Sequence, residues 1–128
     1  MHITAPTFLP RMHEYVYADR ILQSIIDFMK KEGKEQVSLV HVKVGELLDL
    51  SSESLNLAYR NLSSDTIASG SKLRVTIERS AVSCRKCGFE GRLSVHGSHT
   101  IDPAYACPRC GSPLRISKGN SVEIVKVE

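Results

Sequence analysis

Two closely spaced cysteine pairs constrain this chain more than any other feature. Cys84 and Cys87 form one Cys-x-x-Cys motif, and Cys107 and Cys110 form a second. Residues 88–106 separate the pairs, a spacing typical of four-cysteine zinc sites. Each pair can bend as a knuckle that aims two thiolates at one point, and four thiolates complete a tetrahedral shell without an open position. The pattern therefore predicts a structural zinc ion, not a catalytic one.

A redox-active dithiol is the main alternative, because thioredoxin-like sites also use Cys-x-x-Cys. Those sites use one motif, whereas this chain has two. Each motif here is followed directly by a glycine, Gly88 or Gly111. Glycine permits the positive φ that turns backbone amides toward sulfur. Apolar residues are sparse around the cysteines, so we expect the metal to contribute to the folding of this region. Iron in place of zinc, or a redox sensor, are weaker alternatives.

Composition narrows the class of protein. The 128 residues carry a net charge of +3, with acids and bases interspersed and no tryptophan. This balance does not favour nucleic-acid binding. No apolar run approaches the roughly 20 residues of a membrane helix, and residues 1–11 lack the features of a secretory signal. We expect a cytoplasmic protein without a membrane contact, whose paired cysteines bind metal rather than form disulfides.

Apolar periodicity predicts the secondary structure. Two segments repeat apolar residues at three- and four-residue steps, the pattern of a helix with one buried face. They begin at Glu14 and at Ser51 or Ser52. Three segments with alternating or β-branched residues predict strands, at 37–47, 73–78 and 121–128. We predict an α+β fold in which two helices pack on a small three-stranded sheet, with an inserted four-cysteine zinc-ribbon-like module.

A resemblance to a known family rests on four features in a fixed order. Met-His-Glu at 12–14 opens the first helix, Gly-Glu-Leu at 45–47 ends the first strand, the cysteine pairs follow, and Gly119 precedes the last strand. From residue 12 to the end, the chain resembles the HypA family of nickel metallochaperones. The resemblance implies a carrier that delivers Ni(II) for maturation of [NiFe]-hydrogenase, or urease, with a HypB-like GTPase and the hydrogenase large subunit. It does not imply an enzyme, and we find no P-loop or catalytic triad.

The resemblance places the nickel-binding motif at Met12, His13 and Glu14. In that family the motif is N-terminal, so imidazole, terminal amine and backbone amides form a nitrogen-rich, square-planar site that suits Ni(II). The eleven residues before Met12 would remove its free amine. The extension therefore bears directly on the nickel site.

Three arrangements are compatible with the extension. We favour translation that starts at Met12, which restores the amine. In the second arrangement His13 binds nickel together with carboxylate oxygens. In the third, Met1 and His2 supply an amine and an imidazole at the end of the arm. The candidate carboxylates are those of Glu14, Glu46 and Asp49.

We predict an N-terminal extension (1–11), a nickel-binding α/β domain (12–80 plus 119–128) and a zinc-binding domain (81–118), in a monomer or homodimer. His96 and His99 lie between the cysteine pairs and are interpreted as solvated loop residues, with a nickel ligand as the alternative. The alternative function is a zinc-ribbon interaction module that contacts a protein or nucleic acid through a basic face. That face would contain Arg85, Lys86, Arg92, Arg109 and Arg115.

Overall fold

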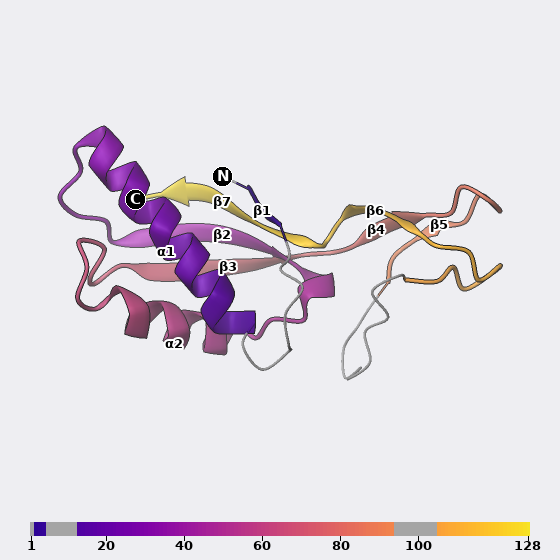
Figure 1. Cartoon of the computed structure of the whole chain (residues 1–128), viewed down its shortest axis with the longest axis horizontal. Helices are drawn as coiled ribbons and strands as arrows, with labels where there is room; N and C mark the ends of the chain where they lie inside the picture. Colours follow the sequence, from indigo (N-terminus) through magenta and orange to yellow (C-terminus); the bar gives the residue numbers. More distant parts are fainter. Residues whose placement is uncertain (1, 5–12, 94–104) are drawn as a thin grey trace.

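The computed structural model describes residues 2–4, 13–93 and 105–128. Two helices lie against a four-stranded sheet, and a second sheet of three short strands extends from its end (Figure 1). The elements are β1 (His2–Thr4), α1 (His13–Glu32), β2 (Leu39–Gly45), the 3₁₀ turn η2 (Glu46–Leu48), α2 (Ser52–Ser63), β3 (Lys72–Glu78), β4 (Ala81–Ser83), β5 (Glu90–Gly91), β6 (Arg115–Lys118) and β7 (Ser121–Val127).

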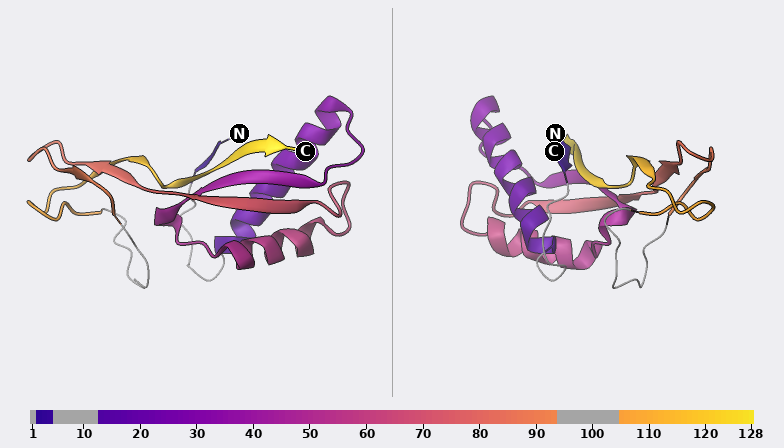
Figure 2. Two further views of the ribbon diagram at one scale, coloured as in Figure 1. Left: turned by 180° about the vertical axis from the view of Figure 1, so that it is seen from behind. Right: turned by 45° about the vertical axis from the view of Figure 1, so that its right-hand side comes forward.

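The larger sheet has the strand order β1-β7-β2-β3, in which β2 and β3 run parallel and the other pairs antiparallel. The smaller sheet has the order β5-β4-β6 and is antiparallel throughout. It projects away from the helices, at the opposite end of the molecule from the C-terminus (Figure 2). Among the described residues, no helix is long and apolar enough to span a membrane.

Helix α1 follows its apolar pattern. Ala18, Ile21 and Ile25 are fully buried on one side, whereas Lys30 and Lys31 occupy the last turn. Lysine side chains are favourable there because the C-terminal end of a helix carries partial negative charge. The helix ends at Glu32. Gly33 follows it with a φ of 66°, and the Lys34 N–H donates to the Met29 carbonyl at 2.8 Å.

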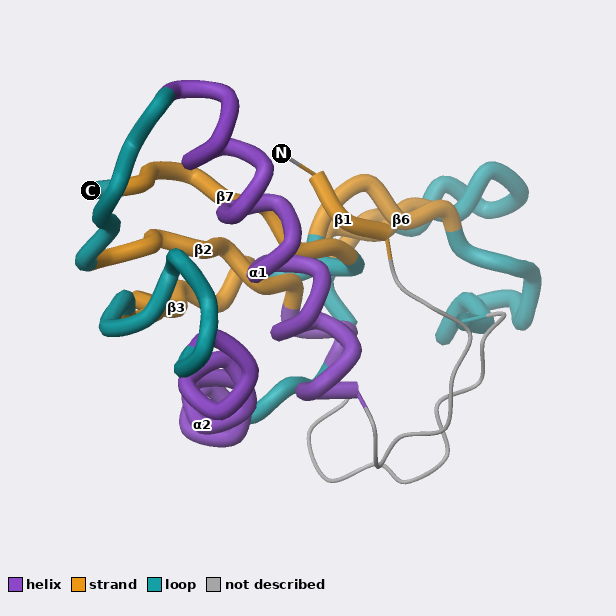
Figure 3. The backbone as a smooth tube through the Cα atoms, turned by 60° about the vertical axis from the view of Figure 1, so that its left-hand side comes forward, coloured by secondary structure: helices purple, strands orange, loops and turns teal. Residues whose placement is uncertain are grey.

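Helix α2 begins at a serine cap. The Ser51 hydroxyl accepts a hydrogen bond from the Ser54 N–H at 3.3 Å, and Glu53 lies in the first turn. Leu55, Ala58 and Tyr59 then face the core. Both helices lie on one side of the larger sheet (Figure 3), and the buried valines of β2 belong to the same apolar core as the buried residues of the helices. These valines are Val40, Val42 and Val44.

The predicted fold class is confirmed, with one strand more than expected in the larger sheet. Residues 2–4, in the segment predicted to be an arm, form β1 and pair with β7 at its outer edge. The cysteine-bearing segment enters between β3 and β7, as predicted. The segment between the larger sheet and the first cysteine also forms a strand, β4, which gives the module a sheet of its own.

Candidate metal centre

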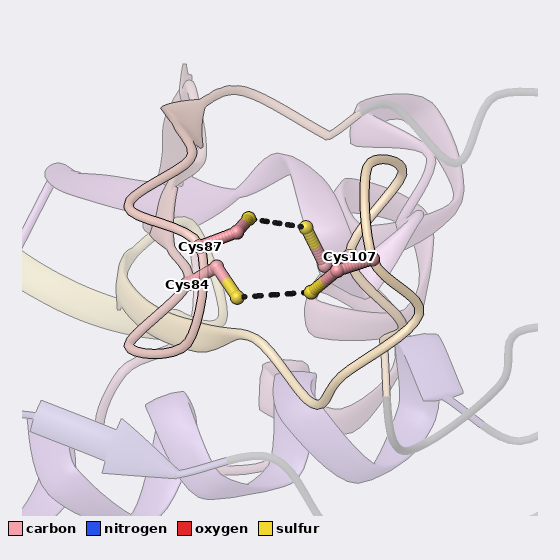
Figure 4. A group of neighbouring side chains, drawn as sticks. Cys84, Cys87 and Cys107 are labelled. Carbon is pink, nitrogen blue, oxygen red and sulfur yellow. Dashed lines mark hydrogen bonds between the residues drawn. The ribbon is translucent and has the colours of Figure 1, made fainter.

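Four cysteine sulfurs converge at the end of the smaller sheet. All four Sγ atoms lie within 4.8 Å of one another. Cys84 lies 3.6 Å from Cys110, and Cys87 lies 3.6 Å from Cys107, so each knuckle faces the other across the centre (Figure 4). Sulfurs of a tetrahedral site with Zn–S bonds of about 2.3 Å are about 3.8 Å apart. The cluster therefore has the size of a four-thiolate zinc site, and its sulfurs are too far apart for disulfides.

The two knuckles share one backbone pattern. In each, the glycine after the second cysteine has a positive φ, 80° at Gly88 and 76° at Gly111. Each glycine N–H donates to the carbonyl of the first cysteine, at 3.0 and 2.9 Å. The N–H of each first cysteine donates in turn to the carbonyl five residues later, in both cases at 2.7 Å. The repeated geometry explains why both motifs need a glycine at the same position.

Hydrogen bonds in the second knuckle favour its thiolates. The hydroxyl and N–H of Ser112 lower the pKa of Cys110 to about 6. Burial raises the pKa of Cys107, but hydrogen bonds from the N–H groups of Cys110 and Arg109 and from the Cys87 thiol outweigh that effect and lower the pKa. The Arg109 N–H lies 3.4 Å from the Cys107 sulfur. Because metals bind thiolates, these donors prepare the cluster for a cation.

The strands position the first knuckle. Strand β4 leads directly into Cys84, and β5 returns beside it, with Val82 opposite Gly91 and Ser83 opposite Glu90. The second knuckle is closed by a bridge between Ala106 and Pro113. Both knuckles are thus held by short antiparallel segments, which matches a structural role for the centre.

The predicted nickel motif, Met12 to Glu14, is described only in part. His13 is the first residue of α1, and Glu14 is half-buried in its first turn. Met12 lies outside the described residues, as do Met1, His96 and His99. Asp49 is exposed and adopts the left-handed conformation with φ of 51°, at the end of η2.

Glu46, a candidate carboxylate in the sequence analysis, is buried and hydrogen-bonded through both of its oxygens. Its side chain is only 3% exposed, and both carboxylate oxygens accept hydrogen bonds from Arg92. The Ser80 N–H also donates to it. In this arrangement both carboxylate oxygens are paired with Arg92, whose own side chain stays 47% exposed. Sequence analysis missed this pair because the two residues are far apart in the chain.

Comparisons with known proteins show the family of this chain. The model of the family described as "Hydrogenase/urease nickel incorporation, metallochaperone, hypA" matches residues 12–128. The protein named hydrogenase maturation factor HypA in Thermococcus sibiricus is 34% identical, over 91% of this chain and 97% of that one. Its namesake in Methanococcus vannielii is also 34% identical, over 88% and 93% of the two chains.

Solved structures share the fold. The solution structure of the Ni metallochaperone HypA from Helicobacter pylori superimposes with a TM-score of 0.63, at 17% identity, over 90% of this chain and 95% of that one. A second solution structure, of a HypA protein, gives a TM-score of 0.62 at 18% identity. At these identities the similarity extends to the arrangement of the helices and sheets.

Proposed function

Because the chain belongs to the HypA family, we propose that it is a nickel metallochaperone that binds Ni(II) and delivers it during maturation of [NiFe]-hydrogenase, while a zinc ion holds its four-cysteine module together. The family match over residues 12–128 carries this proposal. It begins at the Met-His-Glu motif and includes both cysteine pairs. The relatives are named as hydrogenase maturation factors.

The two metals have different requirements. Cys84, Cys87, Cys107 and Cys110 would hold zinc in a closed shell, since a four-thiolate site has no position for exchange. Nickel is cargo and must leave, so its site needs open or easily lost ligands. His13, with backbone nitrogens and Glu14, would bind it at the start of α1. Transfer would proceed by ligand exchange with a partner.

The domain division follows from these roles. We propose an extension (1–11), a nickel-binding α/β domain (12–80 plus 119–128) and a zinc-binding domain (81–118). The partners implied by the family are a HypB-like GTPase and the hydrogenase large subunit, with urease as an alternative target. We propose a cytoplasmic protein and no catalysis of its own, as a monomer or homodimer.

One observation favours the alternative function, a zinc-ribbon interaction module. Arg85, Lys86 and Arg115 line a shallow depression together with Pro113 and Leu114, beside the knuckles. A basic depression with an apolar floor suits an anionic partner. Salt-dependent binding to RNA or to an acidic protein, without nickel binding, would favour this function.

A nickel titration tests the proposal. We would compare the zinc-loaded full chain, a protein starting at Met12, and the latter with His13→Ala, using absorption spectra and metal analysis. His41→Ala is the matched control, because His41 lies on the uncovered side of β2, next to Glu128. We expect the Met12-start protein to bind one nickel, His13→Ala to lose it, and His41→Ala to retain it. If no form binds nickel while zinc stays bound, the carrier function is wrong.

A further inference from the structure

The larger and smaller sheets meet at a tightly packed crossing. A Cβ on Gly45 would lie 2.1 Å from the Gly119 carbonyl carbon, and a Cβ on Gly119 would lie 2.5 Å from the Ser80 Cα. The Leu47 N–H donates to the Gly119 carbonyl at 2.8 Å. The end of β2, the link from β3 to β4 and the link from β6 to β7 therefore touch backbone to backbone. At this point the chain enters and leaves the four-cysteine module, which we define as residues 81–118.

An ion pair between a buried carboxylate and an exposed guanidinium crosses this junction. Glu46 belongs to the turn after β2, whereas Arg92 comes directly after β5 in the four-cysteine module. Arg92 donates from Nε to Oε2 and from Nη2 to Oε1, both at 2.7 Å. Such a two-pronged pair fixes orientation as well as distance, because the guanidinium and carboxylate planes must align.

Ser80, in the link from β3 to β4, also contacts this junction. Its N–H donates to the Glu46 carboxylate. Its hydroxyl donates to the Leu93 carbonyl at 2.7 Å and accepts from the Leu93 N–H at 2.8 Å. The Glu46 side chain thus binds Arg92, and the Ser80 side chain binds the backbone of Leu93. Ser80 itself is buried, so its polar groups need these partners to complete their hydrogen bonds.

Arg92 directly follows the hairpin that contains the first knuckle. Cys84 and Cys87 lie in the turn between β4 and β5, and the Cys84 N–H donates to the Phe89 carbonyl at 2.7 Å. Because β5 is only two residues long, its position depends on that turn. Order in the metal-binding knuckle and the placement of Arg92 are therefore linked through one hairpin.

We propose that Glu46 is a positioning residue that fixes the four-cysteine module in one orientation on the helix-bearing sheet, through Arg92 and Ser80, and that metal in the cysteine cluster maintains this contact. The α/β part and the four-cysteine module are thereby presented to a partner as one rigid surface. The inference rests on metal binding by the cysteine cluster, but not on nickel binding.

Nuclear magnetic resonance of the zinc-loaded full chain tests the first half. Glu46→Gln keeps the side-chain volume and removes the charge, and Arg92→Lys keeps the charge but not the two-pronged contact. Glu78→Gln is the matched control, since Glu78 pairs with Lys43 within the larger sheet at 3.6 Å. Residual dipolar couplings report the orientation of the two sheets, and amide exchange at Leu93 reports the contact.

We expect Glu46→Gln to accelerate exchange of the Leu93 amide about tenfold or more, as for the loss of a hydrogen bond to a charged group. The couplings of the two sheets should then require separate alignment tensors. Arg92→Lys should have an intermediate effect, and Glu78→Gln none. If Glu46→Gln and Glu78→Gln behave alike, the proposal is wrong. If Glu46→Gln fails to fold, Arg92→Gln, at a half-exposed position, decides by the same measurements.

Zinc removal tests the second half. We expect a chelator to accelerate exchange at Leu93 in the natural chain by at least as much as Glu46→Gln does with zinc bound, because loss of the metal releases the hairpin that positions Arg92. Metal analysis must show full zinc in every variant beforehand. Unchanged Leu93 exchange after verified zinc loss would overturn the link between metal and contact. Failure of nickel binding would leave these results unaffected, so the two proposals are separable.

Discussion

At the scale of single residues, close approach decides which positions tolerate change. Gly119 has a φ of 96°, and a Cβ there would meet the Ser80 backbone; Gly70 has a φ of 86° with nothing within 4 Å. Both would suffer from backbone strain, but only Gly119 would also suffer a clash. Sequence analysis singled out Gly119 as part of a motif, without a structural reason; the crossing of chains now provides one.

The two glycines give a matched prediction. Gly70→Ala should cost about 1 kcal/mol of unfolding free energy, the strain of a left-handed alanine. Gly119→Ala should cost about 3 kcal/mol or more, because backbone atoms of Ser80 must also move. Urea unfolding followed by circular dichroism measures both. Equal costs would mean that the backbone around Gly119 and Ser80 can move apart easily, and that the junction is less rigid than its contacts indicate.

A pH dependence is expected from Glu46. Hydrogen bonds from Arg92, together with the Ser80 N–H, outweigh burial and lower its pKa from 4.5 to about 2. A carboxyl group with a lowered pKa stabilises the fold above its unfolded value and loses that contribution as the pH falls. The stability difference between the natural chain and Glu46→Gln should therefore be full above about pH 5 and shrink as the pH falls from 4.5 toward 2.

Unfolding free energies of both proteins across that range measure this effect, with Glu78→Gln as the control for general acid effects. Acid also protonates cysteine thiolates, so zinc content must be followed in parallel. Comparison of variants at equal zinc content isolates the Glu46 contribution. A constant difference down to pH 2 would contradict the lowered pKa.

At the scale of elements, local signals were sufficient only where an apolar pattern repeats along the chain. Helices and strands with buried apolar stripes were predicted because their periodicity lies within a few consecutive residues, as in α1 and β2. Strand β1 was missed because its three residues, His-Ile-Thr, are too few for a pattern, and it exists only by pairing with β7. The N-cap of α2 was left between Ser51 and Ser52, and the structure identifies Ser51.

Replacement of these two serines tests the cap. Ser51→Ala should lower the unfolding free energy by about 1 kcal/mol, because the Ser54 N–H loses its acceptor. Ser52→Ala should change it by less than about 0.5 kcal/mol, since Ser52 contacts Asn56 only through its backbone carbonyl. Thermal and urea unfolding of the two variants provide the comparison. A larger loss at Ser52 would reassign the start of the helix.

At the scale of the whole molecule, the sequence predicted the two parts but not their connection. The cysteine spacing predicted a four-sulfur cluster because ligand spacing is a local property, and the structure brings those sulfurs together. The contact between Glu46 and Arg92 joins residues with no shared motif, and only the fold makes them neighbours. Arg92 was consequently grouped with surface cations, and Glu46 with candidate nickel ligands.

The two parts also differ in what stabilises them. The apolar core joins α1, α2 and three strands of the larger sheet. Within the described part of the chain, no residue of 81–118 belongs to this core, and the buried apolar side chains of that module are Val82, Cys84 and Cys107. We therefore expect this module to depend on a metal in the cysteine cluster for its stability, and the helix-bearing sheet to be stable without one.

Chelation should therefore unfold the molecule in part. After zinc removal from the natural chain, amide exchange should rise by orders of magnitude in β4, β5 and β6, while α1 and β2 keep most of their protection. Cys107→Ser should give the same pattern without a chelator, because three thiolates hold zinc less tightly than four. The control is a chelator already saturated with zinc, which should change nothing. Loss of protection in α1 at the same zinc occupancy would show that the metal stabilises the whole molecule, and that the junction at Glu46 transmits disorder as well as orientation.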